Sequence, residues 1–254
     1  MSTIASALSD SRVMIGREVR HDLRSIDALV TGTAMPVLIL TMFVFVFGGA
    51  ITTGTGHYVD YVVPGVILLC AGFGSASTAV GVATDMKTGT IDRLRTLPIF
   101  APAVLVGHVV ASVIRNLGAT TIVIAFALLY GFRSPASIPG WLLAVGMIVL
   151  CVPAFTWISC SVGLVVGPEA ASGLTFVLLF LPYVSSGFVP TASMPAGLRW
   201  FANHQPLAPV TETVRSLLLG TPVHHGTAAV IWLVGVMAAG QTAAISLHRR
   251  RPAR

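Results

Sequence analysis

The residues most able to do chemistry lie in one short charged stretch, TDMKTGTIDRLRTLPIF, which runs from Thr84 to Phe100. It carries two Asp, one Lys and two Arg between two long apolar segments. Gly89 breaks the chain, Thr90 is a good N-cap for a helix from Ile91, and Pro98 disfavours helical geometry at the residue before it. The spacing predicts one or two helical turns, which either dock into a groove of a partner protein or form a solvated loop that only orients the chain.

Sequence patterns for catalysis and nucleotide binding are absent. The chain has no G-x-x-x-x-G-K-[ST] loop, no G-x-S-x-G elbow and no H-E-x-x-H pair. Cys70, Cys151 and Cys160 lie in apolar runs without metal-ligand spacing, so we expect them to be buried packing residues. We therefore expect no catalytic residue, no metal and no cofactor bound by this chain.

The composition is that of an integral membrane protein. Of 254 residues, 55% are hydrophobic and 9% are charged, whereas about 25% are charged in ordinary soluble domains. The net charge is +6, but the basic residues are sparse and cluster beside apolar segments, as orienting residues do. We therefore expect no nucleic-acid partner.

Membrane helices need about 20 mostly apolar residues, and six windows meet this requirement. The fifth contains Pro182, which membrane helices tolerate when the freed carbonyls find partners. The fold class is therefore an all-α membrane protein with six transmembrane helices, predicted at Val30–Ala50, Val59–Val82, Val104–Tyr130, Trp141–Val166, Ser172–Val189 and Thr227–Leu247.

Basic residues concentrate on one side of this topology. Four Arg precede the first span, one Lys and two Arg lie between the second and third, and four Arg follow the sixth. By the positive-inside rule, both termini and the charged stretch are cytoplasmic in a multi-pass protein of the cytoplasmic membrane.

The chain is predicted to form a single transmembrane domain over residues 1–254. Residues 1–29 form an amphipathic leader at the cytoplasmic interface, and residues 30–189 hold spans 1–5. Residues 190–222 are too polar to span, so one or two short external helices are expected, the last ending at Gly220. The last span, 227–247, precedes a basic cytoplasmic tail, 248–254.

Arg115 is the one basic residue predicted within a span, about eleven residues from its start. An arginine inside a membrane costs at least a few kcal/mol, so it marks a functional candidate. Two interpretations stay open: Arg115 lines a substrate path, or it snorkels to the cytoplasmic headgroups.

Two segments resemble signatures of the type-2 permeases of ABC transporters. DMKTGTIDRLRTLPI is similar to their acidic-x-x-x-G-T-x-x-x-L-x-x-x-P pattern after the second span. NHQPLAPVTETVRSLLLG resembles the late motif of the daunorubicin/doxorubicin-resistance-like branch. The six spans, the amphipathic leader, a cytoplasmic coupling helix and a short external re-entrant region agree with this family.

The resemblance implies positions for two functional regions. Asp85 stands where many relatives have Glu, which keeps the charge but shortens the reach. The predicted ATPase-coupling residues, including charged neighbours of the signature, are Asp85, Lys87, Gly89, Thr90, Asp92, Arg93, Leu94 and Pro98, with Gly167, Pro168 and Glu169 as a second contact. The external gate candidates are Asn203, Gln205, Pro206, Pro209, Glu212 and Arg215. Glu212 and Arg215 are also three apart on one helical face, which predicts an ion pair.

The resemblance further implies an ATP-driven exporter of hydrophobic or amphipathic compounds such as drugs, polyketides or lipids. Two separate P-loop ATPase subunits would bind ATP and Mg, and a second permease half, identical or homologous, would complete the path within the membrane lipid. The alternative is a polytopic membrane scaffold or assembly subunit that transports nothing.

Overall fold

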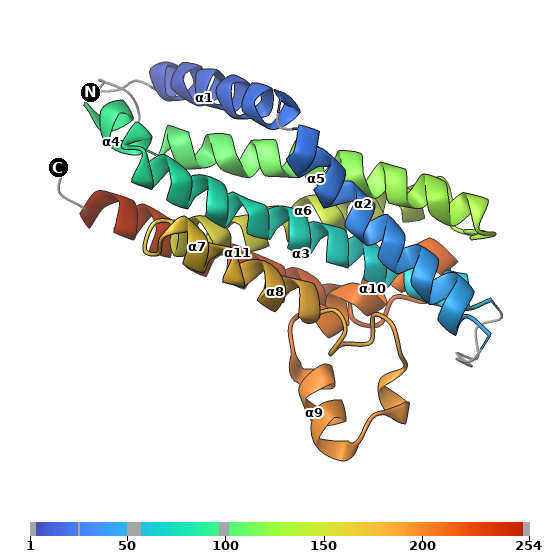
Figure 1. Cartoon of the computed structure of the whole chain (residues 1–254). Helices are drawn as coiled ribbons and strands as arrows, with labels where there is room; N and C mark the ends of the chain where they lie inside the picture. Colours follow the sequence, from blue (N-terminus) through green and yellow to red (C-terminus); the bar gives the residue numbers. More distant parts are fainter. Residues whose placement is uncertain (1–3, 25, 50–56, 97–101, 251–254) are drawn as a thin grey trace.

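The computed structural model describes residues 4–24, 26–49, 57–96 and 102–250, and within these ranges it contains helices and turns but no strand. Figure 1 shows the helices gathered into one elongated bundle. In chain order they are α1 (Ile4–Arg24), α2 (Ile26–Met42), the π-helical turn Phe43–Phe47, α3 (Tyr58–Lys87), α4 (Thr90–Arg95), α5 (Ala103–Leu129), α6 (Ile138–Gly163), α7 (Pro168–Ala171), α8 (Gly173–Phe180), the 3-10 turn Thr191–Ser193, α9 (Ala196–His204), α10 (Leu207–Leu219) and α11 (Gly226–Arg250).

Within the described ranges, four helices are long and apolar enough to cross a membrane: α3, α5, α6 and α11. They correspond to the second, third, fourth and sixth predicted spans, so those helices are confirmed. Shorter apolar helical stretches, Gly32–Phe47 and Pro168–Phe180, fall at the first and fifth predicted spans. The structure agrees with an all-α membrane protein, and the number of six crossings stays a prediction.

The predicted fifth span is helical only in its first half. Helix α8 ends at Phe180, and the chain then makes a series of turns as far as Phe188. Pro182 has no backbone N–H to continue the helical ladder, and the next donors bond three or four residues back, from Tyr183 and Val184 to the carbonyl of Phe180. The prediction of a continuous helix from Ser172 to Val189 was therefore wrong.

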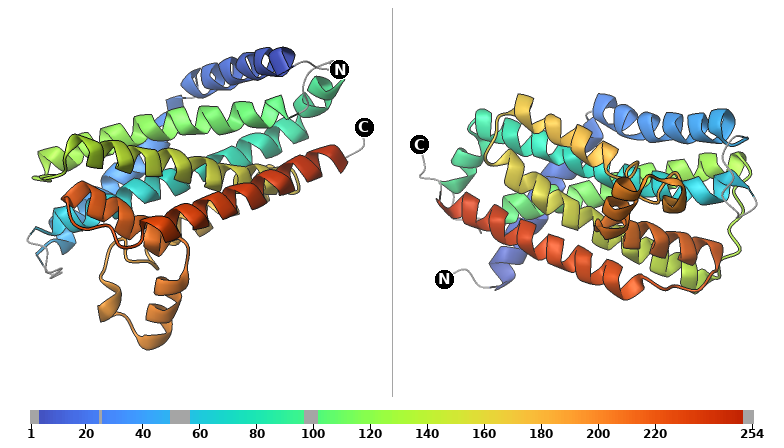
Figure 2. Two further views of the ribbon diagram at one scale, coloured as in Figure 1. Left: turned by 180° about the vertical axis from the view of Figure 1, so that it is seen from behind. Right: turned by 90° about the horizontal axis from the view of Figure 1, so that it is seen from below.

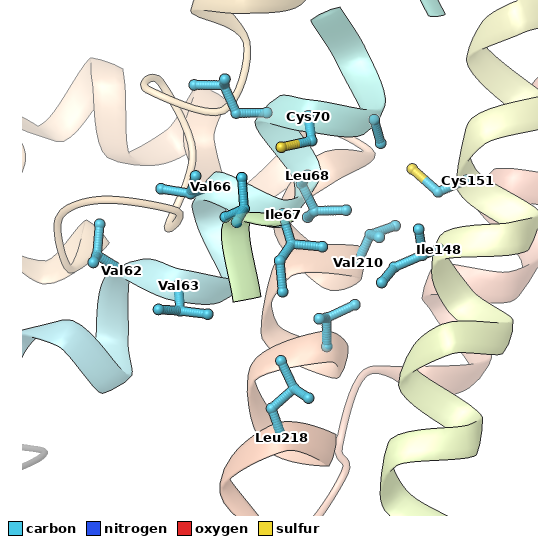
Figure 3. Packing of buried hydrophobic residues seen from close by; sticks show 14 of the residues in the cluster. Val62, Val63, Val66, Ile67, Leu68, Cys70, Ile148, Cys151, Val210 and Leu218 are labelled. Atoms are coloured by element: carbon cyan, nitrogen blue, oxygen red, sulfur yellow. The ribbon is translucent and has the colours of Figure 1, made fainter. Parts of the chain in front are cut away.

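Helix α3 is the centre of the bundle. Its neighbours include α5, α6, α8 and α10, and most of its apolar window is buried. Figure 3 shows Ile67 and Leu68 of α3 on the side that faces Ile148 of α6 and Val210 of α10. The three cysteines are free and buried, which confirms their predicted packing role.

Glycines allow the closest helix contacts, as is usual where helices pack in a membrane. At Gly163, near the end of α6, a Cβ atom would clash with the carbonyl oxygen of Ala79 on α3. Gly240 of α11 also lies close to α6, where a Cβ atom would meet the backbone of Trp157 and Ile158 at about 3 Å. Gly74 of α3 likewise lies close to a neighbouring helix, against the side chain of Asn116 on α5.

Replacement of Gly163 by leucine is expected to lower the free energy of unfolding by about 1–3 kcal/mol, because the added side chain must push α6 away from α3. The measurement is the thermal unfolding midpoint of the full chain in detergent. Gly146→Leu is the matched control, since Gly146 lies on the same helix with no atom near its Cβ position. Equal midpoints for the two variants would contradict the close packing.

The two ends of the bundle differ. The start of α1, the end of α11, α4 and α7 lie at one end, as Figures 1 and 2 show, and the loops after α5 and α10 lie at the other. Helix α10 packs among α3, α6 and α11, whereas α9 projects from the side of the bundle. The two short helices predicted before the last span are present, and α10 is stopped by Gly220 in the left-handed conformation, φ 64°.

Candidate functional site

The charged stretch forms a tight reversal between two long helices. Helix α3 ends at Lys87, and α4 follows after Gly89, whose left-handed φ of 72° favours glycine. The prediction of Thr90 as N-cap was wrong, because Gly89 occupies the cap position and α4 already begins at Thr90. The Thr90 hydroxyl instead contacts the Thr88 hydroxyl at 2.9 Å.

The two faces of α4 have different surroundings. Ile91 is fully buried and Leu94 packs partly buried against the same cluster, which includes Leu105 of α5. Arg93 is exposed on the other face, with Asp92 half-buried beside it. The apolar residues therefore hold α4 on the bundle, and the charged face remains accessible. Pro98 lies outside the described residues.

The second predicted cytoplasmic contact lies against the first. Gly167 caps α7 in an extended conformation, and Pro168 and Glu169 form its first turn. The ammonium of Lys87 donates to the carboxylate of Glu169 at 3.1 Å, although both side chains are well exposed. The pKa of Glu169 lies below its usual value because backbone N–H donation and the Lys87 hydrogen bond and charge stabilise its carboxylate. The fold thus brings together two loops that are far apart in sequence.

Asp85 differs from the other charged coupling residues because its partners lie on α1 and α5 inside the bundle. Its carboxylate lies 3.4 Å from Nε2 of His108 on α5 and 3.5 Å from the guanidinium of Arg17 on α1. Its side chain is 19% exposed. Asp85 therefore faces α1 and α5 and stands apart from the exposed face of α4.

Arg215 ties three segments together in the half of the bundle away from α4. Its guanidinium donates to the carbonyl oxygens of Tyr61 at 3.2 Å, Ser186 at 2.6 Å and Gly187 at 3.3 Å. It also donates to Glu212 at 2.7 Å, which confirms the predicted ion pair. The guanidinium carbon lies 3.9 Å from the centre of the Tyr61 ring. These contacts join α3, α10 and the turns after α8, a set that we call the Arg215 knot.

A cavity of about 610 Å³ lies beside the Arg215 knot, between α9, α10 and α11. The gate candidates Asn203, Gln205, Pro209 and Glu212 are among its lining residues. Gln205 is held by a 2.8 Å bond from its amide to the carbonyl of Val184. Four predicted gate residues therefore line one cavity, and Arg215 holds one of them, Glu212, in place.

Arg115 has a partner that the sequence did not indicate. It forms an ion pair with Asp22 of α1 and donates to the carbonyl of Gly74 at 2.8 Å and to the Thr78 hydroxyl at 3.1 Å. The pair lies along an apolar groove of about 780 Å³ between α1, α2 and α5. Sequence separation explains the omission, since Asp22 is 93 residues from Arg115 and belongs to the leader.

The buried side of α1 was also missed. The spacing of Ile15, Val19 and Leu23 indicated an apolar face, but Leu23 is exposed, whereas Met14 and Glu18 are buried against the bundle. Gly107 of α5 has no side chain, so the backbone of Met14 can lie close against it. The acidic side of α1 faces the protein because Glu18 contacts His108 and Asp22 contacts Arg115, both on α5.

The fold and these sites define a class: a polytopic α-helical membrane protein that carries no P-loop and presents a charged helix–loop surface at one end of its bundle. The family model for the ABC-2 type transporter matches residues 10–219. The chain belongs to the ABC-2 type transporter family, as a membrane permease subunit of an ABC exporter.

Two curated relatives narrow the branch. The chain is 33% identical over 214 residues to the daunorubicin resistance ABC transporter permease protein DrrB1 of Streptomyces coeruleorubidus, covering 82% of this chain and 72% of the relative. It is 24% identical over 253 residues to the probable doxorubicin resistance ABC transporter permease protein DrrC of Mycobacterium tuberculosis, covering 92% and 84%.

Proposed function

We propose that this permease exports hydrophobic or amphipathic compounds, driven by two P-loop ATPase subunits that bind ATP and Mg and dock at the end of the bundle that carries α4. The drug resistance named for the relatives supports this substrate class. The low charge of the long helices supports it as well, since their walls are aliphatic and aromatic. A second permease half, identical or homologous, completes the path within the membrane.

One observation carries the docking proposal. Three exposed side chains lie at the same end of the bundle: Lys87 at the end of α3, Arg93 on α4 and Glu169 on α7. Lys87 contacts Glu169, and we call the three residues the coupling surface. Ile91 anchors α4 on the bundle, so a push on this surface is passed to α3 and α5. A charged surface on a rigid mount suits a partner that transmits movement.

The orientation and the gate follow from the same proposal. The coupling surface, the start of α1 and the end of α11 face the cytoplasm, in agreement with their basic residues. The cavity beside the Arg215 knot then faces outward, where α10 and Gln205 close the exit until the two permease halves separate.

Reversal of charge at Arg93 is expected to reduce the amount of ATPase that co-purifies with the tagged full-length permease by about tenfold, because a charge at a docking contact is then repelled. The measurement is mass spectrometry of P-loop proteins retained from native membranes by Arg93→Glu and by wild type. Arg133→Glu is the matched control, since Arg133 is exposed at the other end of the bundle. Leu94 is left unchanged because it packs against the bundle.

Two outcomes would overturn the proposal. Wild-type permease that retains no P-loop ATPase would indicate the alternative, a membrane scaffold without transport. If Arg93→Glu retained as much ATPase as wild type, α4 would not be part of the docking contact. A further test of the substrate class is ATP hydrolysis by the reconstituted complex in liposomes, which amphipathic drugs should stimulate.

A further inference from the structure

Four charged or titratable side chains form a closed ring between α1, α3 and α5. Arg17 donates to Glu18 at 2.7 Å, and Nδ1 of His108 lies 3.3 Å from the other Glu18 oxygen. Nε2 of His108 lies 3.4 Å from Asp85, and Arg17 lies 3.5 Å from the same Asp85 oxygen. Each cation is thus placed between two carboxylates, and each carboxylate between two nitrogen groups.

The ring is largely removed from solvent. The side chains of Glu18, His108 and Asp85 are 6%, 9% and 19% exposed. Buried charges are tolerated when they are paired and balanced. With His108 protonated, the four groups sum to zero charge, whereas a neutral imidazole leaves two carboxylates facing one Arg.

The imidazole also needs its second proton for geometric reasons. Its two nitrogens face different carboxylates, and a neutral imidazole can donate from only one of them. The other nitrogen would then present a lone pair to a carboxylate, which repels it. Histidine is the side chain suited to a reversible change of charge, so gain or loss of the second proton on His108 completes or breaks the ring.

The other charged and titratable groups near His108 are accounted for among the residues that the structure describes. Arg115 is occupied by Asp22, Gly74 and Thr78, and α6 contributes only the thiol of Cys160 near Glu18. The titratable and charged residues that face the ring across the same small cavity or pack beside it, among those the structure describes, are Arg17, Glu18, His21 and Asp22 of α1, Asp85 of α3, Arg115 of α5 and Cys160 of α6.

A divalent cation is the competing occupant, since Glu18, Asp85 and His108 each offer a ligand atom within 4.8 Å of the others. Two features disfavour it. A bound metal ion would have to contact one nitrogen of His108 and both carboxylates. The two carboxylates, however, lie beside different nitrogens of the ring, Glu18 at Nδ1 and Asp85 at Nε2. Arg17 already contacts both carboxylates, so a doubly charged ion would meet a cation at close range.

We propose that Arg17, Glu18, His108 and Asp85 form a proton-dependent clasp that holds the N-terminal helix α1 on α3 and α5, with His108 and Glu18 as positioning residues for Asp85 at the base of the coupling segment. Protonated His108 closes the clasp, and loss of that proton loosens α1. Asp85 lies a few residues before α4, so a change in the clasp would affect coupling to the ATPase. That consequence rests on the proposed function, whereas the clasp itself is independent of it.

The test measures the docking of α1 directly. A cysteine at Met14, which is buried against Gly107, is labelled with a membrane-impermeant maleimide in the full-length permease in lipid nanodiscs, with the native cysteines replaced by alanine. Ser9→Cys, exposed on the same helix, gives the reference rate at each pH and corrects for thiol ionisation. The ratio of the two rates reports how often α1 leaves the bundle.

We expect the ratio to rise about tenfold from about pH 5.5 to about pH 8.5 in the wild-type ring. His108→Lys, which keeps the positive charge, should hold the ratio low across the range, and His108→Gln should hold it high. A ratio independent of pH in the wild-type ring overturns the proposal. So does a ratio at high pH that falls on addition of Zn²⁺ and rises with EDTA, because a metal would then hold α1.

The assay contains no ATPase, so its outcome is independent of the docking proposal. If the labelling shows the expected pH dependence but the permease retains no ATPase, the clasp stands and only its role in coupling is removed. An open, pH-independent α1 with normal ATPase retention would remove the clasp and leave the coupling surface.

Discussion

Replacement of Arg215 by methionine is expected to lower the free energy of unfolding by about 3 kcal/mol or more and to abolish export. The side chain is buried and donates to three main-chain carbonyl oxygens and to Glu212, so its loss leaves acceptors without a donor. It would also free the turns after α8 from α3 and α10. The measurements are the thermal unfolding midpoint in detergent and drug efflux from cells.

Two controls separate the guanidinium fork from charge alone. Arg215→Lys should recover little of the lost stability or export, because an ammonium cannot bond to Tyr61, Ser186 and Glu212 at once with fixed geometry. Arg133→Met, at an exposed position, should leave the midpoint unchanged. A wild-type midpoint for Arg215→Met would show that the Arg215 knot does not hold the outer segments.

Charge exchange between Asp22 and Arg115 is the second prediction with a large effect. Asp22→Arg and Arg115→Asp should each lower the free energy of unfolding by about 2–4 kcal/mol, because each puts two like charges together at mostly buried positions. The double variant restores opposite charges and should recover about half of the combined loss. Recovery is incomplete because the bonds from Arg115 to Gly74 and Thr78 are lost.

The double-mutant cycle is measured as unfolding midpoints of the four proteins under one set of conditions. Losses that simply add would show that Asp22 and Arg115 do not interact in solution. Such a result would return Arg115 to its two sequence-based interpretations, a residue of the substrate path or one that snorkels to the headgroups. A recovered double variant would instead assign Arg115 to the attachment of α1.

The contacts of α1 and α4 suggest how movement passes through the permease. Arg93 of the coupling surface lies on α4, which Ile91 and Leu94 attach to the bundle near α5. Asp85 lies one turn before α4 and joins the clasp that holds α1. If an ATPase displaces α4, the contact between Asp85 and Arg17 would pass the movement to α1, which lines the apolar groove together with α2.

Local patterns were sufficient to predict the long helices. An uninterrupted apolar stretch of membrane length has few alternatives to a helix, so α3, α5, α6 and α11 begin near their predicted starts. Gly89 and Gly220 predicted reversals for the same local reason, since their left-handed φ values favour glycine. The Glu212–Arg215 pair was equally local, three residues apart on one helix.

Pro182 marks the limit of such reasoning. A proline inside an apolar window either kinks a membrane helix or ends it, and the outcome depends on where the freed carbonyls find donors. Here Tyr61 and Arg215, from two other helices, donate to the carbonyl of Ser186 in the turns that follow α8. Those partners make the non-helical turns stable, and nothing within the window itself indicates them.

The sequence by itself determined the class of the protein, its long helices, the charged reversal after α3 and the family signature, because these depend on composition and on neighbours along the chain. Only the tertiary structure decided which charges meet. Asp22 with Arg115, Lys87 with Glu169, and His108 with Glu18 and Asp85 are pairings across helices. Their energies depend on burial and on distances of a few ångströms, and both exist only after the helices have packed.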